Sequence, residues 1–156
     1  MAESIDIREL NILIEQKSSF VANITAGMNR VIVGQKHLVD TLLIGLLSDG
    51  HILLEGVPGL AKTLAIKTLS QLIDSEYSRI QFTPDVVPSD ITGFTMYDKN
   101  TGKFEYKDGA VMCNFFLADE INRTSSKTQS ALLEVMQEGK LTVDGEIHMI
   151  PKPFVV

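Results

Sequence analysis

The stretch His51–Leu64, with the sequence HILLEGVPGLAKTL, decides the fold. It begins with a short apolar run, His51–Glu55, which is typical of a strand buried in a parallel sheet. The residues Gly56–Gly59 cannot continue a strand or a helix, because two glycines and a proline interrupt either pattern. Apolar residues then recur at helical spacing from Leu64 to Ile73. The order of strand, glycine-rich loop and helix predicts an α/β unit.

The loop in this unit is suited to hold phosphate groups. Residues Gly56–Thr63 resemble the Walker A pattern, in which glycines let backbone N–H groups curl around an anion. The helix that follows directs its N-terminal N–H groups at the same point. Lys62 is expected to reach the β and γ phosphates, and the Thr63 hydroxyl to ligate Mg²⁺. Ala61 replaces the usual glycine, which costs nothing if this position begins the helix with negative φ.

The alternative for this loop is a helix-starting turn that binds nothing. We predict a nucleotide site instead, because the pattern stands between a strand and a helix. The cofactor-binding residues predicted here are Gly56, Val57, Pro58, Gly59, Leu60, Ala61, Lys62, Thr63 and Leu64.

A second apolar run, Phe115–Ala118, ends in two carboxylates and resembles Walker B. We expect Asp119 to hold Mg²⁺, directly or through water, and Glu120 to act as general base on the attacking water. Taken alone, such an Asp-Glu pair is equally consistent with a solvated loop that binds nothing. Ligands of open α/β sheets bind beyond the carboxyl ends of strands, where both motifs are predicted to lie. The predicted catalytic residues are therefore Glu120 and Lys62, and the predicted magnesium ligands are Thr63 and Asp119.

Helical spacing of apolar residues also predicts elements before the loop. One amphipathic helix is expected over 7–14, a second over 20–28, and a third over 38–47, where Ser48-Asp49-Gly50 breaks it. A later helix is predicted to begin with a capping box of Ser126 and Gln129 and to end at Gly139.

Two hairpins are predicted in the second half of the chain. One turns at Asn100-Thr101-Gly102, between the segments 94–97 and 104–106. The other turns at Asp144-Gly145, a dipeptide that suits a turn in which both central residues have positive φ.

Composition limits the class of protein. A chain of 156 residues suits one compact domain, and its net charge of −6 argues against a surface built for nucleic acid. The single cysteine, Cys113, forms no internal disulfide, is expected to be buried, and favours a reducing, cytoplasmic location. No apolar stretch approaches the roughly 20 residues that cross a bilayer. The last residues, Pro153–Val156, have the pattern of an entry to another buried strand, so we expect a longer protein.

Several segments, in order, resemble the MoxR family of AAA+ ATPases from about Val31 to the end. They are Val31–Gln35 (VIVGQ), Leu54–Thr63 (LEGVPGLAKT), Gln81–Asp85 (QFTPD), Pro88–Gly93 (PSDITG), Leu117–Arg123 (LADEINR) and Lys127–Glu134 (KTQSALLE). The resemblance implies a P-loop NTPase fold, a three-layer α/β sandwich with a parallel central sheet. The resemblance further implies that the chain is the AAA+ large subdomain, C-terminally truncated, with N-terminal helices and two β-hairpins. The implied division is a helical segment over 1–30 packed on the core and a nucleotide-binding subdomain over 31–156.

The resemblance also implies partners and cofactors. The family uses ATP and Mg²⁺, and Val33 and Gly34 match positions that lie against the adenine. On pattern alone these two residues belong to a turn before a helix. Family members hydrolyse ATP as ring oligomers, usually hexamers. They act as chaperone-like proteins that remodel or activate partners, often ones with von Willebrand A domains. The hairpins match insertions that face the pore or neighbours, although plain solvent-facing ribbons are equally consistent.

Some parts of the AAA+ machinery are expected beyond Val156. The strand with the sensor-1 residue is expected to begin at Phe154, and the arginine finger and the helical lid with sensor 2 have no counterpart. Arg123 is either a nucleotide contact or a surface or helix-capping arginine. We therefore expect this chain alone to hydrolyse ATP poorly. A P-loop GTPase would share the Walker A pattern, but the sequence contains no Asn-Lys-x-Asp guanine motif. A nucleotide-gated scaffold without turnover and a nucleic-acid motor remain as alternatives.

Overall fold

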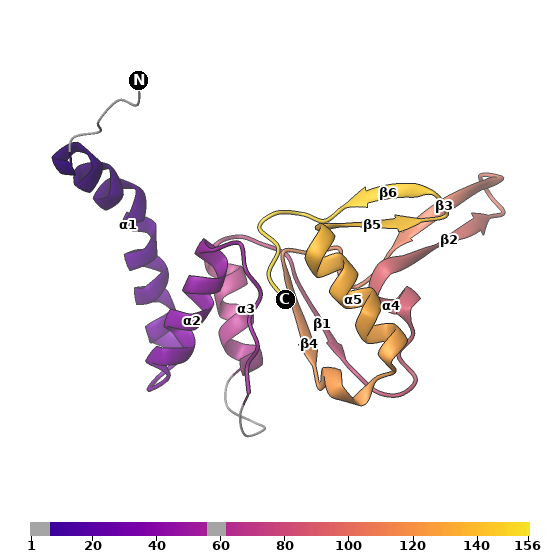
Figure 1. Cartoon of the computed structure of the whole chain (residues 1–156), viewed down its shortest axis with the longest axis horizontal. Helices are drawn as coiled ribbons and strands as arrows, with labels where there is room; N and C mark the ends of the chain where they lie inside the picture. The colour runs from indigo at the N-terminus through magenta and orange to yellow at the C-terminus, as the bar shows by residue number, and fades with distance from the viewer. Residues whose placement is uncertain (1–6, 56–61) are drawn as a thin grey trace.

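The computed structural model describes residues 7–55 and 62–156 (Figure 1). Its helices and strands, in chain order, are α1 (Ile7–Val31), α2 (Lys36–Leu47), α3 (Lys62–Leu72), β1 (Tyr77–Gln81), α4 (Pro88–Thr92), β2 (Gly93–Asp98), β3 (Lys103–Asp108), β4 (Phe115–Asp119), the short 3₁₀ helix η1 (Ile121–Arg123), α5 (Ser126–Glu138), β5 (Lys140–Val143) and β6 (Glu146–Met149).

The strand β4 lies at the centre of a three-layer arrangement. Phe115 and Phe116 are both buried but belong to different apolar clusters, because successive residues of a strand point to opposite faces. Phe115 packs with buried residues of α1, α2 and α3, whereas Phe116 packs with those of α4 and α5. A strand covered on both faces accounts for the continuous apolar run in its sequence. The predicted α/β sandwich with a parallel sheet is confirmed.

The sheet around β4 is parallel. β1 pairs with β4 in a register that sets Tyr77 opposite Phe115 and Gln81 opposite Asp119. On the other edge of β4, Phe115 forms a parallel bridge with Val155. The segment that begins at Phe154 therefore lies beside β4.

The predicted strand His51–Glu55 is not a strand in the structure. Among the described residues, one backbone hydrogen bond reaches this segment, from the Ile52 N–H to the Val156 carbonyl (2.8 Å). A strand needs a succession of such bonds to its neighbour. The C-terminal residues lie between this segment and β4. His51 also contacts them, because its ring accepts a hydrogen bond from the Val156 N–H (3.1 Å).

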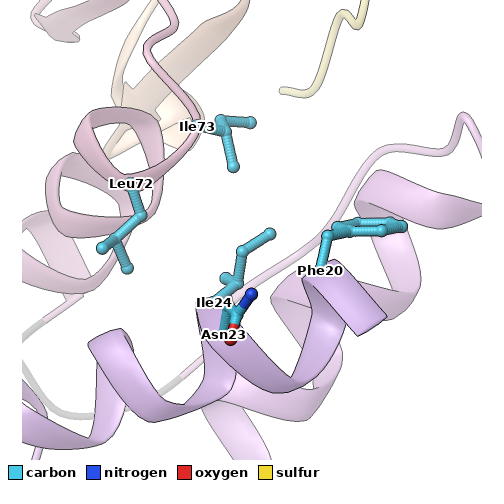
Figure 2. Close-up of a pocket in the computed structure, with 5 residues that line it drawn as sticks. All are labelled: Phe20, Asn23, Ile24, Leu72 and Ile73. Atoms are coloured by element: carbon cyan, nitrogen blue, oxygen red, sulfur yellow. The ribbon is translucent and has the colours of Figure 1, made fainter. Parts of the chain in front are cut away.

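The first two predicted helices form one continuous helix, α1. Ser18 and Ser19 do not break it, because their hydroxyls donate to the carbonyls of Glu15 and Gln16 within the same helix. Its C-terminal half packs on the core, and its N-terminal half is exposed and projects from the body (Figure 1). A small hollow of about 270 Å³ lies where α1 meets the end of α3. Figure 2 shows the side chains that line it: Phe20, Asn23, Ile24, Leu72 and Ile73. The boundary predicted at residue 30 stays a prediction.

Both predicted hairpins are confirmed as the antiparallel pairs β2–β3 and β5–β6. In the second, Asp144 and Gly145 have φ of 51° and 86°, as the predicted turn requires. The helix α2 confirms the prediction over 38–47 and begins two residues earlier. Cys113 is buried, also as predicted. No helix of the described residues combines the length and hydropathy needed to cross a membrane.

The capping box predicted for α5 is wrong by one residue. Ser125 is the N-cap, and its hydroxyl oxygen accepts from the Thr128 N–H (3.3 Å). Gln129 instead donates its side-chain N–H to the carbonyls of Ile121 and Thr124, so it secures the segment before the helix. Gly139 ends α5 with φ 61°, as predicted.

Candidate functional site

A cavity of about 950 Å³ lies between the start of α3 and the carboxyl end of β4. Four predicted site residues line it together: Lys62, Thr63, Asp119 and Glu120. Much of the remaining lining is apolar and comes from the segment 51–55, from β4 and from α5. The predicted loop residues Gly56, Val57, Pro58, Gly59, Leu60 and Ala61 lie outside the described residues.

The helix α3 fixes the position of Lys62 and Thr63. Buried Ala65 and Leu69 anchor the helix to the core, which leaves its first turn at the cavity. Lys62 is the first residue of α3, and its ammonium group donates to the Leu54 carbonyl (3.3 Å). The same amine is therefore beside the segment that enters the loop.

An unusual backbone conformation brings Asp119 and Glu120 to the same cavity. Asp119 is the last residue of β4, and Glu120 follows in the left-handed region with φ 59° and ψ 41°. Non-glycine residues seldom adopt this conformation, and those that do cluster at functional sites. Adjacent strand residues would point to opposite faces, but this turn at Glu120 leads the chain into η1. Both carboxylates consequently line one cavity.

Asp119 is paired with an arginine that the sequence analysis did not single out. The Arg79 guanidinium on β1 donates to the Asp119 carboxylate Oδ2 at 2.6 Å. The same nitrogen, Nη2, also donates to the side-chain carbonyl of Gln81 at 2.7 Å. The hydrogen bond with Asp119 raises the pKa of Arg79, so this side chain remains a cation. Arg79 escaped sequence reasoning because it precedes the segment Gln81–Asp85 that carries the family resemblance, and because β1 has no continuous apolar run.

The remaining predicted residues lie elsewhere or have no role shown. Val33 and Gly34 lie in the turn between α1 and α2, and neither is among the described residues that line the cavity. Val33 is 84% exposed, so an adenine contact there stays a prediction. Leu64 is on α3 but is not among the residues that line the cavity, and Arg123 is exposed at the end of η1. Asn122, which carried no predicted role, does line the cavity.

The residues present suit a magnesium ion. Magnesium prefers oxygen ligands and is usually held by one or two carboxylates together with phosphate oxygens and water. The Thr63 hydroxyl and the Asp119 carboxylate supply oxygens to the same cavity. Within 7–55 and 62–156, no cluster of three or more histidine, cysteine, aspartate or glutamate side chains is arranged to hold a metal. The oxygens of Thr63 and Asp119 suit a metal that takes its other ligands from phosphate and water.

The chain is similar in sequence to known proteins. Residues 51–156 match the ATPase family associated with various cellular activities (AAA). The chain is 54% identical over 129 residues to the chaperone MoxR1 of Mycobacterium tuberculosis and 52% identical over 129 residues to the uncharacterised protein YeaC of Bacillus subtilis. Each alignment covers 83% of this chain. The chain spans 34% of the length of the first relative and 40% of the second.

A solved structure gives the same relationship. The structure of a proposed ATPase from Cytophaga hutchinsonii superposes with a TM-score of 0.82 at 46% sequence identity. The match covers 95% of this chain and 46% of that protein. The family match over most of the chain, the identity to MoxR1 and this structural likeness agree with one another. The chain belongs to the AAA family of ATPases, and within it to the MoxR family.

Proposed function

We propose that this chain binds ATP with Mg²⁺ in the cavity between α3 and β4. The observation that carries the proposal is the meeting of Lys62 and Thr63 with Asp119 and Glu120 around one cavity, although the two pairs are far apart in sequence. Family membership supports nucleotide binding as the use of this cavity.

Each of the four residues has a role that follows from its chemistry. Lys62 supplies a positive charge to the β and γ phosphates from the first turn of α3, whose N–H groups also favour an anion. Thr63 and Asp119 offer oxygens to the metal. Glu120 orients a water molecule and accepts its proton during attack on the γ phosphate. When bound, the magnesium ion neutralises charge on the phosphate oxygens.

Binding is tested by calorimetric titration of ATP in the presence of Mg²⁺. Lys62→Ala removes a charged hydrogen-bond donor worth about 1.5–3 kcal/mol, so we expect affinity to fall about 10- to 100-fold. Lys67→Ala is the matched control, because Lys67 is an exposed lysine on the same helix and does not line the cavity. Equal affinities for wild type and Lys62→Ala would contradict the proposal.

A second measurement separates an ATPase from a nucleotide-gated scaffold. In an ATPase, Glu120→Gln abolishes phosphate release and leaves ATP bound, whereas a scaffold is unchanged by this substitution. Glu134→Gln, at an exposed position on α5, is the control.

For the whole protein we propose a cytoplasmic ring, with a hexamer as the assembly, that remodels partner proteins. The name of the relative, chaperone MoxR1, supports a chaperone-like role, and proteins with von Willebrand A domains are the partner class to test first. The net charge of −6 makes a nucleic-acid motor the less favoured alternative. Light scattering with and without ATP measures the assembly.

A further inference from the structure

We infer that Arg79 is a positioning residue that holds the Asp119 carboxylate for magnesium. The inference rests on the proposed function, since it assigns Asp119 to the metal. It adds a residue on a neighbouring strand, β1, to a site otherwise built from α3 and the end of β4. Arg79 touches neither nucleotide nor metal in this scheme and acts through Asp119.

The parallel register of β1 and β4 places the three side chains together. Gln81 stands directly opposite Asp119, and Arg79 precedes Gln81 by two residues, so Arg79 and Gln81 share a face of β1. The guanidinium nitrogen Nη2 lies between the Gln81 side-chain carbonyl at 2.7 Å and Asp119 Oδ2 at 2.6 Å. Arg79 is therefore held from two sides, and the position of the Asp119 carboxylate is fixed by it.

The contact leaves Asp119 able to bind a metal. A carboxylate has two oxygens and about four lone-pair positions, and the arginine engages Oδ2 alone. Side chains that hydrogen-bond to a metal-binding carboxylate orient it, and their loss typically costs 10- to 100-fold in metal affinity. A purely competitive arginine would have the opposite effect, because its removal would free the carboxylate and tighten magnesium binding.

Stability does not account for this pair. Both side chains are partly exposed, at 41% for Arg79 and 35% for Asp119, and ion pairs in such surroundings contribute about 0–1 kcal/mol. The pair is nevertheless the shortest of the ion pairs between described residues, the others being 2.9 Å or longer. Close, two-point geometry at the edge of the cavity is the arrangement expected of an orienting contact.

The experiment measures ATP binding by calorimetry over a series of Mg²⁺ concentrations and again with the metal chelated. Magnesium is expected to increase the affinity for ATP. For Arg79→Ala we expect the Mg²⁺ concentration that gives half of this increase to rise about 10-fold or more. The affinity for metal-free ATP is expected to change less than about twofold, which a general loss of structure would not allow. Arg79→Lys keeps the positive charge on a side chain of different length and shape, and is expected to restore part of the effect.

Two further variants make the result specific. Gln81→Ala removes the second support of the guanidinium and is expected to shift the magnesium dependence in the same direction by a smaller factor, even if Arg79→Ala folds poorly. Lys107→Ala breaks an ion pair on β3 and is expected to change nothing. An unchanged or lowered Mg²⁺ requirement in Arg79→Ala would overturn the inference alone. Absence of magnesium-dependent ATP binding in the wild type would overturn it together with the proposed function.

Discussion

The Thr128 hydroxyl ties two distant segments together, and its removal gives a quantitative test of the structure. Thr128 is fully buried on α5, and its hydroxyl donates to the Val86 carbonyl at 3.0 Å, 42 residues away in sequence. The Ser125 hydroxyl lies 3.0 Å from the Thr128 hydroxyl oxygen. Ser125 is the donor in this contact, because the single hydroxyl proton of Thr128 goes to the Val86 carbonyl. The Thr124 hydroxyl also reaches the Val86 carbonyl, at the longer distance of 3.4 Å.

Thr128→Val replaces the hydroxyl with a methyl group of similar size, so no cavity term enters. A buried polar group left without its partner costs about 1–3 kcal/mol. The Val86 carbonyl keeps the long contact from Thr124, and exposed Ser125 can turn to water, which places the expected loss in the lower half of that range. We expect the free energy of unfolding to fall by about 1.5 kcal/mol.

Urea unfolding followed by circular dichroism measures this loss. With a denaturant slope of about 1–3 kcal/mol per molar, the midpoint is expected to fall by about 0.5–1.5 M. Thr142→Val, at an exposed position on β5, is the control and is expected to stay within about 0.5 kcal/mol. The double variant Thr124→Val, Thr128→Val is expected to lose more than the sum of the singles, because the Val86 carbonyl then loses both donors. Equal midpoints for Thr128→Val and Thr142→Val would refute the reasoning.

Two further predictions concern a glycine and the cysteine. Gly93→Ala is expected to destabilise the chain by several kcal/mol and Gly102→Ala by about 1–2 kcal/mol. Both glycines have positive φ, but they differ in the space around an added Cβ. At Gly93 the Cβ would lie 2.2 Å from the Lys107 carbonyl oxygen, whereas at Gly102 the nearest atom given is 3.8 Å away. Similar urea midpoints for the two variants would contradict the predicted difference. Burial raises the pKa of Cys113 to about 12 from an ordinary 9.0, so the folded thiol is expected to resist a disulfide reagent at pH 8 until denaturant is added. The folded state holds this proton more tightly, so its contribution to stability is complete below pH 9 and is lost as pH rises towards 12, a slope that Cys113→Ala should flatten.

Elements whose signal is local could be predicted from the sequence. The turn at Asp144-Gly145 follows from the backbone preferences of two adjacent residues. The strand β4 follows from a continuous apolar run, because both of its faces are covered. Asp119 at the end of that strand was placed at a cavity edge by the general rule for parallel sheets.

Features that depend on a distant partner could not be predicted. The run His51–Glu55 has the composition of a strand, but strand structure requires a ladder, and that depends on the neighbouring chain segment. The strand β1 could be recognised only from its pairing with β4 in the structure. The contact of Arg79 with Asp119 depends on the register of that pairing. The positive φ of Glu120 has no sequence signal, since glutamate does not favour it.

Glu120 also marks a position where selection for folding and selection for function diverge. Its left-handed backbone costs a glutamate of the order of 1 kcal/mol or more, a cost that glycine would avoid. A library at position 120 that is screened only for thermal stability would therefore enrich glycine or asparagine. The same library screened for nucleotide turnover would retain the carboxylate, so the disagreement between the two screens would itself locate the site.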